Sequence, residues 1–529
     1  MRTTKRRRDA QAALAIVAVS LLGAACAGIQ PKNVPAGSNG PGGPQSQTGT
    51  DPNQGATGLG GFGQFPTGAG TGTGTGSPPP TYMVPVPSGR SGSAATGRPG
   101  APSSGAGSAT NAPRTATGGT YPATPSPAPP APGTPGVSAP APSGGNGGAT
   151  DVGVTADSIK LGGFYIESGP VGSLGITLLK AVKAVYNEVN AEGGIYGRKI
   201  QVVDCDTSFT SGDKPRTCYS KLTQQDKIFA FASAGDGPAM VTASPLICKD
   251  QIPAIWMDGL ASDEFKCPFI FPTGPPGRSQ SHVVADYYVK AKKPKTVGFL
   301  IENDDIGNEW AQGAREVFAT YGVKVVTEQR YNLGDTNLNA QVINMQAANP
   351  DFVFFADEPL GGILFQLQAK SLGYKPPLPA AGVTCNVEIW PREVGDYTKG
   401  MICEHPWQLP QSGLPEHANF EQTYKKYWND WEQRNYYTEI HWVAAKAVVE
   451  TLKAAGPNLT RARLLDVLRR GALNGFDTGF GVKFKQQSSA GGNIFDTEVA
   501  VVEITEPSGK PYYYELRQPP APDPYFTVG

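Results

Sequence analysis

The chain has 529 residues, with 45 lysines and arginines against 45 aspartates and glutamates, so its formal net charge is +0. This balance gives no attraction to a polyanion, and no basic block with interleaved aromatic residues follows the N-terminus, so we expect no nucleic-acid partner. Glycine (67) and proline (49) are far above ordinary usage, and most of the excess lies before residue 150. Only the rest of the chain is therefore expected to build a hydrophobic core.

The N-terminus has the layout of an export signal. Lys5 to Arg8 is a charged stretch, an apolar run extends from Ala12 to Leu22, and small residues precede Cys26. The apolar run is too short to span a bilayer as a stable helix. Residues 1–26 resemble a bacterial lipoprotein signal, in which the cysteine is acylated, so we expect Cys26 to anchor the protein on the extracytoplasmic face of the cell membrane. Simple secretion with cleavage near Ala25 is the alternative.

Residues 27–150 consist of Gly, Pro, Ser, Thr and Ala with almost no large apolar side chains. Such a stretch buries too little surface to offset the entropy of ordering it, so we expect a disordered linker. As a flexible coil, the linker would have a root-mean-square reach of roughly 60 Å. That reach is enough to carry a folded domain through a thick cell-wall layer.

Six cysteines follow Cys26, and an even number in an exported chain indicates disulfides. Nearest-neighbour pairing predicts the bonds Cys205–Cys218, Cys248–Cys267 and Cys385–Cys403. Fifteen connectivities are open to six cysteines, and free buried thiols are a further alternative. No C-x-x-C pair occurs and the four histidines are scattered, so we expect no metal site.

From Asp151 on, short apolar runs alternate with amphipathic stretches. Ile159 to Ile166 predicts a strand, and apolar residues at steps of three and four from Leu174 to Val189 predict a helix that ends at Gly193-Gly194. The same patterns predict further strands at Lys199–Asp204, Ile228–Ser233 and Ile252–Met257, and further helices at Ser211–Gln224 and Gly237–Lys249.

The alternation restarts after Phe271–Gly277, a stretch rich in Pro and Gly that we interpret as a crossing between two lobes. Strands are predicted at Thr296–Ile301, Val323–Tyr331 and Phe352–Ala356, and helices at Gly307–Tyr321, Leu338–Asn349, Gly361–Leu372, Phe420–Arg434 and Thr438–Ala455. A tail rich in β-formers closes the chain, with strands predicted at Val482–Phe484, Val499–Ile504 and Tyr512–Leu516.

This alternation predicts an α/β fold with parallel sheets and helices on both faces. Roughly 380 residues are too many for one core and fit two lobes. In open parallel sheets, ligands bind beyond the carboxyl ends of the strands. That rule selects five loops for ligand contact: Ile166–Gly172, Ser233–Gly237, Trp256–Ser262, Glu302–Gly307 and Asp357–Leu360.

Several segments resemble, in their order and spacing, the branched-chain amino-acid-binding family of periplasmic-binding-protein type I receptors of ABC importers. Val189–Ile200 is similar to the segment that follows the first helix of the family. Later matches fall at Ile252–Ile255, Asn303–Gly307, Asn349–Val353 and Phe476–Gly481. The resemblance covers essentially all of Asp151–Gly529. It implies two Rossmann-like lobes joined by a multi-crossing hinge, with residues 151–276 plus about 404–470 in lobe 1 and residues 277–403 plus about 471–529 in lobe 2.

In that family, the loops after the third and fourth strands hold the ligand carboxylate, and an acidic residue of the second lobe helps to hold the ammonium. Carried over to this chain, those loops supply Ser233, Ala234, Asp236, Trp256, Asp258, Gly259 and Ala261. Ala261 stands at the family's threonine and Ile306 at its tyrosine, so two side chains that contact an amino acid are missing. Asp236 and Asp258 would repel a carboxylate unless a cation intervenes.

The remaining candidates come from the other loops. Tyr165 and Ser168 lie in the first loop, Asp304 follows a strand of the second lobe, and the pair Asp357-Glu358 is the strongest second-lobe candidate. Structural alternatives stay open for several of the candidates, because aspartates such as Asp236, Asp258 and Asp304 also suit helix caps, and Trp256 also suits packing at a lobe edge.

We expect a small polar organic ligand, amino acid or amide-like, that is captured between the lobes and delivered to an ABC permease in the membrane. A sensor that binds the same kind of molecule and signals to a membrane partner is the alternative, because one fold serves both functions. No G-x-S-x-G elbow, P-loop or paired acid–base motif occurs, so we expect neither an enzyme nor a cofactor.

Overall fold

The structure is a computed structural model, and it describes residues 138–525 except 141, 170, 257–258, 262–263, 265, 376–380, 383–384, 386–388, 489–492, 495–497 and 506–513. The expected signal, Cys26 and the linker up to residue 137 lie outside the described residues. All of these residues belong to one compact unit, Gly118–Gly529.

The first sheet is parallel throughout, in the order β2-β1-β3-β4-β5. Its strands are β1 (Ser158–Tyr165), β2 (Lys199–Asp206), β3 (Ala230–Ala232), β4 (Ala254–Trp256) and β5 (Ile270–Pro272). The sequence did not predict β5, and the expected crossing at Phe271–Gly277 begins too early, because Phe271 and Pro272 still pair with β4. A strand of three residues that ends in proline is too short to show an alternating pattern.

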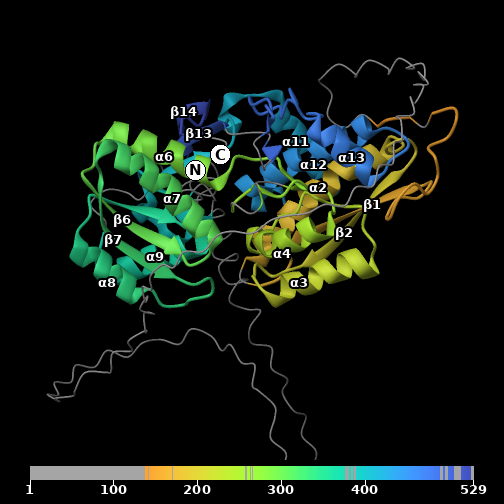
Figure 1. Cartoon of the computed structure of the whole chain (residues 1–529). Helices are drawn as coiled ribbons and strands as arrows, with labels where there is room; N and C mark the ends of the chain where they lie inside the picture. Colours follow the sequence, from red (N-terminus) through yellow and green to blue (C-terminus); the bar gives the residue numbers. More distant parts are fainter. Residues whose placement is uncertain are drawn as a thin grey trace, which may run out of the picture. The chain divides into compact units, whose positions relative to one another are not determined.

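The helices of this half come from two distant parts of the chain, as the orange-to-green and blue ribbons in Figure 1 show. They are α2 (Gly172–Ala191), α3 (Asp213–Ser220), α4 (Gly237–Asp250), α11 (Pro415–Tyr427), α12 (Tyr436–Ala455) and α13 (Arg461–Arg469). α12 packs on α2, and Asn435 and Thr438 form a capping box at its start. The helix expected at Phe420–Arg434 is wrong in its second half, because α11 ends at Tyr427 and only a short 3₁₀ turn follows, at Trp431–Gln433.

The second sheet has the order β14-β13-β10-β9-β8-β6-β7. Its strands are β6 (Thr296–Glu302), β7 (Lys324–Tyr331), β8 (Phe352–Ala356), β9 (Ala381–Gly382), β10 (Ile402–His405), β13 (Glu498–Ile504) and β14 (Tyr514–Pro522). The part from β10 to β7 is parallel as expected, but β13 runs antiparallel to both of its neighbours. This sheet is therefore mixed. The strand expected at Val482–Phe484 is reduced to one bridge, between Lys483 and Asp477.

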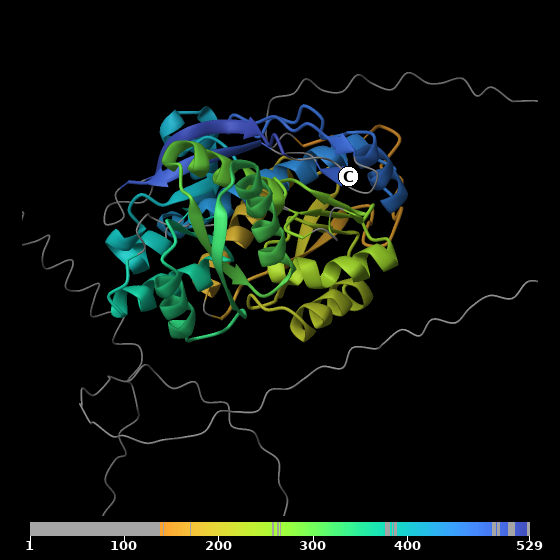
Figure 2. The same cartoon turned by 60° about the vertical axis from the view of Figure 1, so that its left-hand side comes forward.

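The helices of the second half are α6 (Gly277–Lys292), α7 (Asp305–Tyr321), α8 (Asn339–Ala348), α9 (Pro359–Ser371) and α10 (Ile389–Val394). Figure 2, turned by 60°, shows the green helices and strands of this half in front. A two-stranded sheet of β11 (Gln487–Ser488) and β12 (Asn493–Ile494) completes the described strands. We propose that the two sheets with their helices are the cores of lobes 1 and 2, with β10 extending lobe 2 to His405.

The three disulfides predicted by nearest-neighbour pairing are all present. Their Cα–Cα distances are 5.7 Å for Cys205–Cys218, 5.7 Å for Cys248–Cys267 and 5.4 Å for Cys385–Cys403. The first bond joins β2 to α3, and the second joins α4 to the segment before β5. Two of the bonds thus tie a helix of the first half to its own sheet.

The ordered chain begins before Asp151, where we expected the linker to end. Arg198 is fully buried, and its guanidinium donates to the backbone carbonyls of Asn146, Gly148, Thr155 and Pro457. Thr150 also donates to the carbonyl of Leu459. Because a buried charge must be satisfied by hydrogen bonds, this cluster fixes residues 146–150 to the first half of the protein.

Candidate ligand pocket

A cavity of ≈ 40 Å³ lies where loops after strands of both sheets meet. The first half contributes the loops β1–α2, β2–α3 and β3–α4, the first turns of α2 and the starts of α4 and α12. The second half contributes the β8–α9 loop. The lining residues are Ile166, Val171, Leu174, Gly175, Leu178, Phe209, Gly235, Gly237, Glu358, Pro359, Leu360 and Tyr437. The cavity therefore lies at the carboxyl ends of the parallel strands, as the general rule predicts.

The start of α4 is a place where the two halves approach each other closely around this cavity. A Cβ built on Gly237 would lie 2.8 Å from Leu260 Cδ1, 3.2 Å from Glu358 Oε1 and 3.5 Å from Ile306 Cδ1. Glu358 and Ile306 belong to the second half, and Leu260 packs in its hydrophobic cluster. Glycine at this position lets the two halves meet without a side chain between them.

A second lining glycine, Gly235, is needed for a different close approach. A Cβ at Gly235 would collide with the His441 imidazole of α12, which is fully buried. His441 Nδ1 lies 2.6 Å from the Tyr437 carbonyl oxygen, and burial lowers the pKa of His441 to about 4. His441 is therefore a neutral packing residue behind the pocket wall.

The second-half side of the pocket rests on a group of acidic side chains. Glu358 is 5% exposed and lines the cavity, and its backbone N–H donates to Glu302 Oε2 (3.1 Å). Tyr331 donates to Glu302 Oε2 (2.9 Å) and lies 3.4 Å from Asp357 Oδ2. Burial, together with neighbouring Asp304, raises the pKa of Glu302 to about 7, and burial raises the pKa of Asp357 well above its usual value.

Asp236 and Asp304 both cap helices in the structure. Asp236 is fully buried, accepts from the Ala239 backbone N–H (3.1 Å) at the start of α4, and also accepts from the Thr207 hydroxyl. Burial raises the pKa of Asp236 to about 6. Asp304 accepts from the Gly307 backbone N–H (2.8 Å) at the start of α7. The capping interpretation thus accounts for both carboxylates, and neither lines the cavity.

Several other predicted residues are buried within the first half and do not line the cavity. Tyr165 and Trp256 are fully buried in the larger hydrophobic cluster, which includes residues of both halves. Ser233 has a positive φ of 53° and lies 3.1 Å from the Tyr186 hydroxyl. Ala234 is fully buried between Ser233 and the lining residue Gly235. Ser233 and Ala234 thus belong to the loop after β3, next to the lining residue Gly235, whereas Tyr165 and Trp256 are core residues.

The remaining predicted residues also lie outside the cavity wall. Ser168 is exposed and donates from its backbone N–H to Asp206 (3.2 Å). The carbonyl oxygen of Gly259 accepts from Gly277, and that of Ala261 accepts from Glu264. Asp258 lies outside the described residues. Of the predicted side chains, Glu358 lines the cavity and Ile306 reaches to its edge at Gly237. Ligand contact by the others stays a prediction.

Sequence reasoning missed the apolar wall of the pocket. Leu174 and Leu178 belong to the helical stripe that we assigned to the core, and Phe209 lies in the loop after β2, which the strand-end rule covers but which we did not select. Tyr437, at the start of α12, carries no sequence signal for ligand contact. Applying the rule to every strand would have found Phe209.

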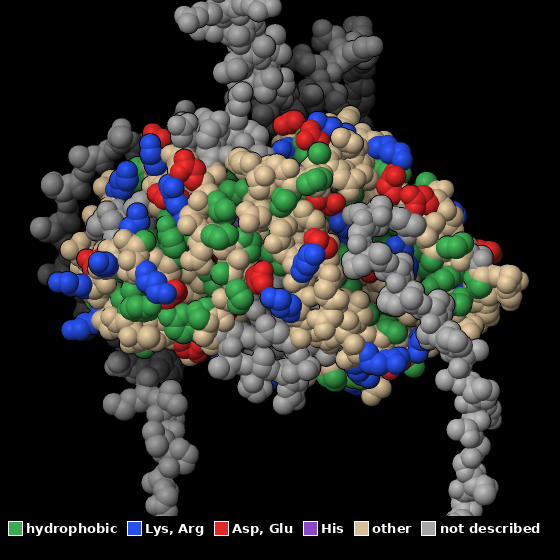
Figure 3. Space-filling view, turned by 90° about the horizontal axis from the view of Figure 1, so that it is seen from above, with side chains coloured by type: hydrophobic (Ala, Val, Ile, Leu, Met, Phe, Trp, Pro, Cys, Tyr) green, Lys and Arg blue, Asp and Glu red, His purple; other side chains and the backbone are tan. Residues whose placement is uncertain are grey.

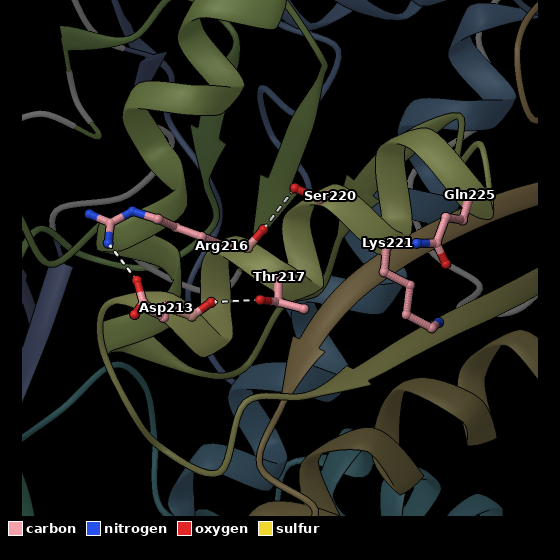
Figure 4. A pocket seen from close by; sticks show the side chains of 6 residues that line it. All are labelled: Asp213, Arg216, Thr217, Ser220, Lys221 and Gln225. Carbon is pink, nitrogen blue, oxygen red and sulfur yellow. Dashed lines mark hydrogen bonds and ion pairs between the residues drawn. The ribbon is translucent and has the colours of Figure 1, made fainter. Parts of the chain in front are cut away.

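A second hollow lies on the surface of α3 and the π-helical turn Lys221–Gln225 that follows it (Figure 4). Arg216 pairs with Asp213 at 3.5 Å, and Thr217 donates to the Asp213 carbonyl oxygen (2.9 Å). Asp213 and Arg216 are exposed on the helix surface. An exposed ion pair of this kind contributes little energy, so this hollow is a weaker candidate than the cavity between the sheets.

The described residues give no sign of a metal centre or of a membrane-spanning helix. No group of three or more of their His, Cys, Asp or Glu side chains is placed to hold a metal ion. Within the same part of the chain, no helix combines the length and the apolar character needed to cross a bilayer. On the face shown in Figure 3, acidic and basic side chains are interspersed, in keeping with the zero net charge.

Two α/β sheets with a cavity at the carboxyl ends of their strands, joined by a chain that crosses between them, define a two-lobed ligand-binding protein. The Periplasmic binding protein family matches residues 158–510, and the chain belongs to this family. Its fold is that of the type I periplasmic binding proteins.

The chain is similar to "Leu/Ile/Val-binding protein homolog 7" of Brucella abortus (strain 2308), with 23% identity over 357 residues, which is 62% of this chain and 86% of the relative. Solved structures share the fold at low identity. A fatty acid ABC transporter substrate-binding protein from Thermomonospora curvata has a TM-score of 0.62 and 19% identity, covering 74% of this chain and 99% of the other. A branched-chain amino acid transporter substrate binding protein from Streptococcus pneumoniae, in complex with isoleucine, has a TM-score of 0.57 and 18% identity, covering 69% and 100%.

Proposed function

We propose that this chain is an extracytoplasmic receptor that captures a small organic ligand between its two lobes and delivers it to an ABC importer. The observation that carries the proposal is the cavity itself, whose wall is built from strand-end loops of both sheets. A ligand in that place contacts both lobes, so binding favours the arrangement in which the lobes meet. An importer that docks on that arrangement would bind the receptor with ligand and would not bind the receptor without it.

Membership of a binding-protein family supports a receptor and gives no support to an enzyme. An export signal followed by Cys26 supports a position outside the cytoplasm on a lipid anchor. We therefore propose that an acyl chain on Cys26 holds the receptor near its permease. Replacing Cys26 by alanine should release the protein into the medium, and a Cys26→Ala protein that stays in the membrane fraction would contradict the anchor.

Uptake measurements test the delivery step. Cells that lack the chain should lose saturable uptake of the ligand that stabilises the purified protein, and expression of the intact chain should restore it. A receptor that instead signals to a membrane partner would leave uptake unchanged and abolish a transcriptional response to the same ligand. Unchanged uptake in the deletion strain would therefore contradict delivery and favour the sensor.

A further inference from the structure

We propose that the pocket takes a ligand with an apolar body and a neutral or cationic head group that donates hydrogen bonds, such as an amine, amide or alcohol, and that it rejects carboxylates. This inference rests on the receptor function proposed above and names the class of its ligand. It changes the expectation of a small polar ligand, amino acid or amide-like, by adding an apolar body and excluding the carboxylate, because the walls of the cavity are mainly apolar.

The lining residues are the first argument. Of the twelve lining residues, three are glycines, and only Glu358 and Tyr437 carry polar side-chain atoms. The other seven have apolar side chains: Ile166, Val171, Leu174, Leu178, Phe209, Pro359 and Leu360. Leu174, Phe209 and Leu360 are half-buried, so a ligand can cover them further. Burial of such surface drives binding of an apolar body.

Charge is the second argument. Glu358 is the only charged residue in the described lining, which contains no lysine, arginine or histidine. Behind Glu358 lies Glu302, which is 1% exposed and whose Oε1 has no hydrogen-bond partner among the described residues. A ligand carboxylate beside Glu358 and Glu302 would bring a further acidic group into a site shielded from water, whereas an N–H or O–H donor would meet acceptor oxygens there.

The helix starts at the pocket are the third argument. Backbone N–H groups at a helix N-terminus often bind anions. Here α4 has Pro238 in its first turn and α9 begins at Pro359, and proline has no N–H to donate. The start of α2 also lies at the pocket, without a side-chain cap, and its Gly172, Leu174 and Gly175 N–H groups donate to the carbonyl oxygens of Gly169 and Val171. The Asp236 carboxylate already accepts the Ala239 N–H. The Asp236 carboxylate thus occupies a backbone donor at the positive end of α4 that could otherwise bind an anionic ligand.

Calorimetric titration of the full chain at pH 7.5 tests this inference. The probes are n-butylamine, n-hexylamine and n-octylamine, with hexanamide and hexanoate as partners of equal chain length. The cavity of ≈ 40 Å³ is smaller than any of these amines, so the lobes must meet less closely around a bound amine than they do in this structure. We expect each added methylene that the apolar lining residues cover to tighten amine binding about threefold to fourfold. We also expect hexanoate to bind at least about tenfold more weakly than hexylamine, because its head group is repelled by Glu358.

Two variants and a control separate the head group from the body. Glu358→Gln should weaken hexylamine binding about tenfold or more and leave hexanamide binding within about twofold. Leu174→Asn should weaken both probes. Glu515→Gln, a change of an exposed acid on β14, should change neither. Glu358→Gln without effect on hexylamine would overturn the role of the carboxylate.

The outcome for hexanoate distinguishes this inference from the receptor function. The ligand class would be overturned if hexanoate bound as tightly as hexylamine, or if the protein bound only polar amino acids. In either case, loss of uptake in the deletion strain would still support the receptor function. If none of the probes binds and deletion of the chain leaves uptake unchanged, both the class and the receptor function fail.

Discussion

Adding one methyl group at Gly237 should hinder the meeting of the two lobes without unfolding either one. In Gly237→Ala, the new Cβ would lie 2.8 Å from Leu260 Cδ1 and 3.2 Å from Glu358 Oε1. Carbon atoms in contact are normally 3.5–4.0 Å apart, and overpacking of this kind costs about 1–3 kcal/mol. Leu260 lies in the same lobe as Gly237 by the expected boundaries, so only the contact with Glu358 requires the lobes to meet. That part of the cost shifts the equilibrium between parted and meeting lobes by up to about 150-fold, and the apparent affinity for ligand falls by a comparable factor.

Two measurements check this prediction on the full chain. Calorimetry should give the weaker affinity, and small-angle scattering should show a larger radius of gyration for Gly237→Ala than for the wild type. The free energy of unfolding should change by less than about 1 kcal/mol, since alanine is well tolerated in the first turn of a helix. Gly144→Ala is the control, because a Cβ there meets nothing within 4 Å. Wild-type affinity and an unchanged scattering curve for Gly237→Ala would refute the reasoning.

Three further predictions concern stability. Arg198→Ala should lower the free energy of unfolding by about 3 kcal/mol or more, because one buried guanidinium serves four backbone carbonyls; urea unfolding measures this loss, and a loss below 1 kcal/mol would contradict it. Burial raises the pKa of the Glu302 carboxyl to about 7. The contribution of Glu302 to the free energy of unfolding is therefore full below pH 4.5 and is lost as the pH rises through 7. Relative to the wild type, the free energy of unfolding of Glu302→Gln should rise by about 3 kcal/mol between pH 4.5 and pH 8, and parallel pH profiles of the two proteins would count against this prediction. Replacing Cys248 and Cys267 by serine should cost about 3 kcal/mol, since their bond closes a loop with a sequence separation of 19; equal urea midpoints would argue against that stabilisation.

The sequence predicted the loops of the pocket better than its side chains. Three of the five loops selected by the strand-end rule line the cavity: those after β1, β3 and β8. Which side chain of such a loop faces a cavity depends on backbone turns and on neighbouring helices. Trp256 turns into the core, and His441 of the distant helix α12 fixes Gly235 as a glycine. Neither contact leaves a periodic signal in the local sequence.

The elements that escaped prediction have short or ambiguous patterns. β5 has three residues, and β9 has two. Helix α6 has charged and polar residues buried along much of its length, including His282 and Asp286, so its stripe is not purely apolar. His282 lies between Asp523 and Glu316, both at 2.7 Å, which makes its burial possible. Partners so far away in the sequence become visible only in the fold.

The central claim is that this protein holds its ligand in the cavity between the two lobes. A crystal structure of the protein with a bound ligand, chosen as the compound that gives the largest thermal stabilisation, tests the claim most directly. The account predicts density for the ligand between Leu174 and Phe209 on one side and Glu358 and Leu360 on the other, with the polar head at Glu358. Density elsewhere, for example in the hollow beside Asp213 and Arg216, would contradict it.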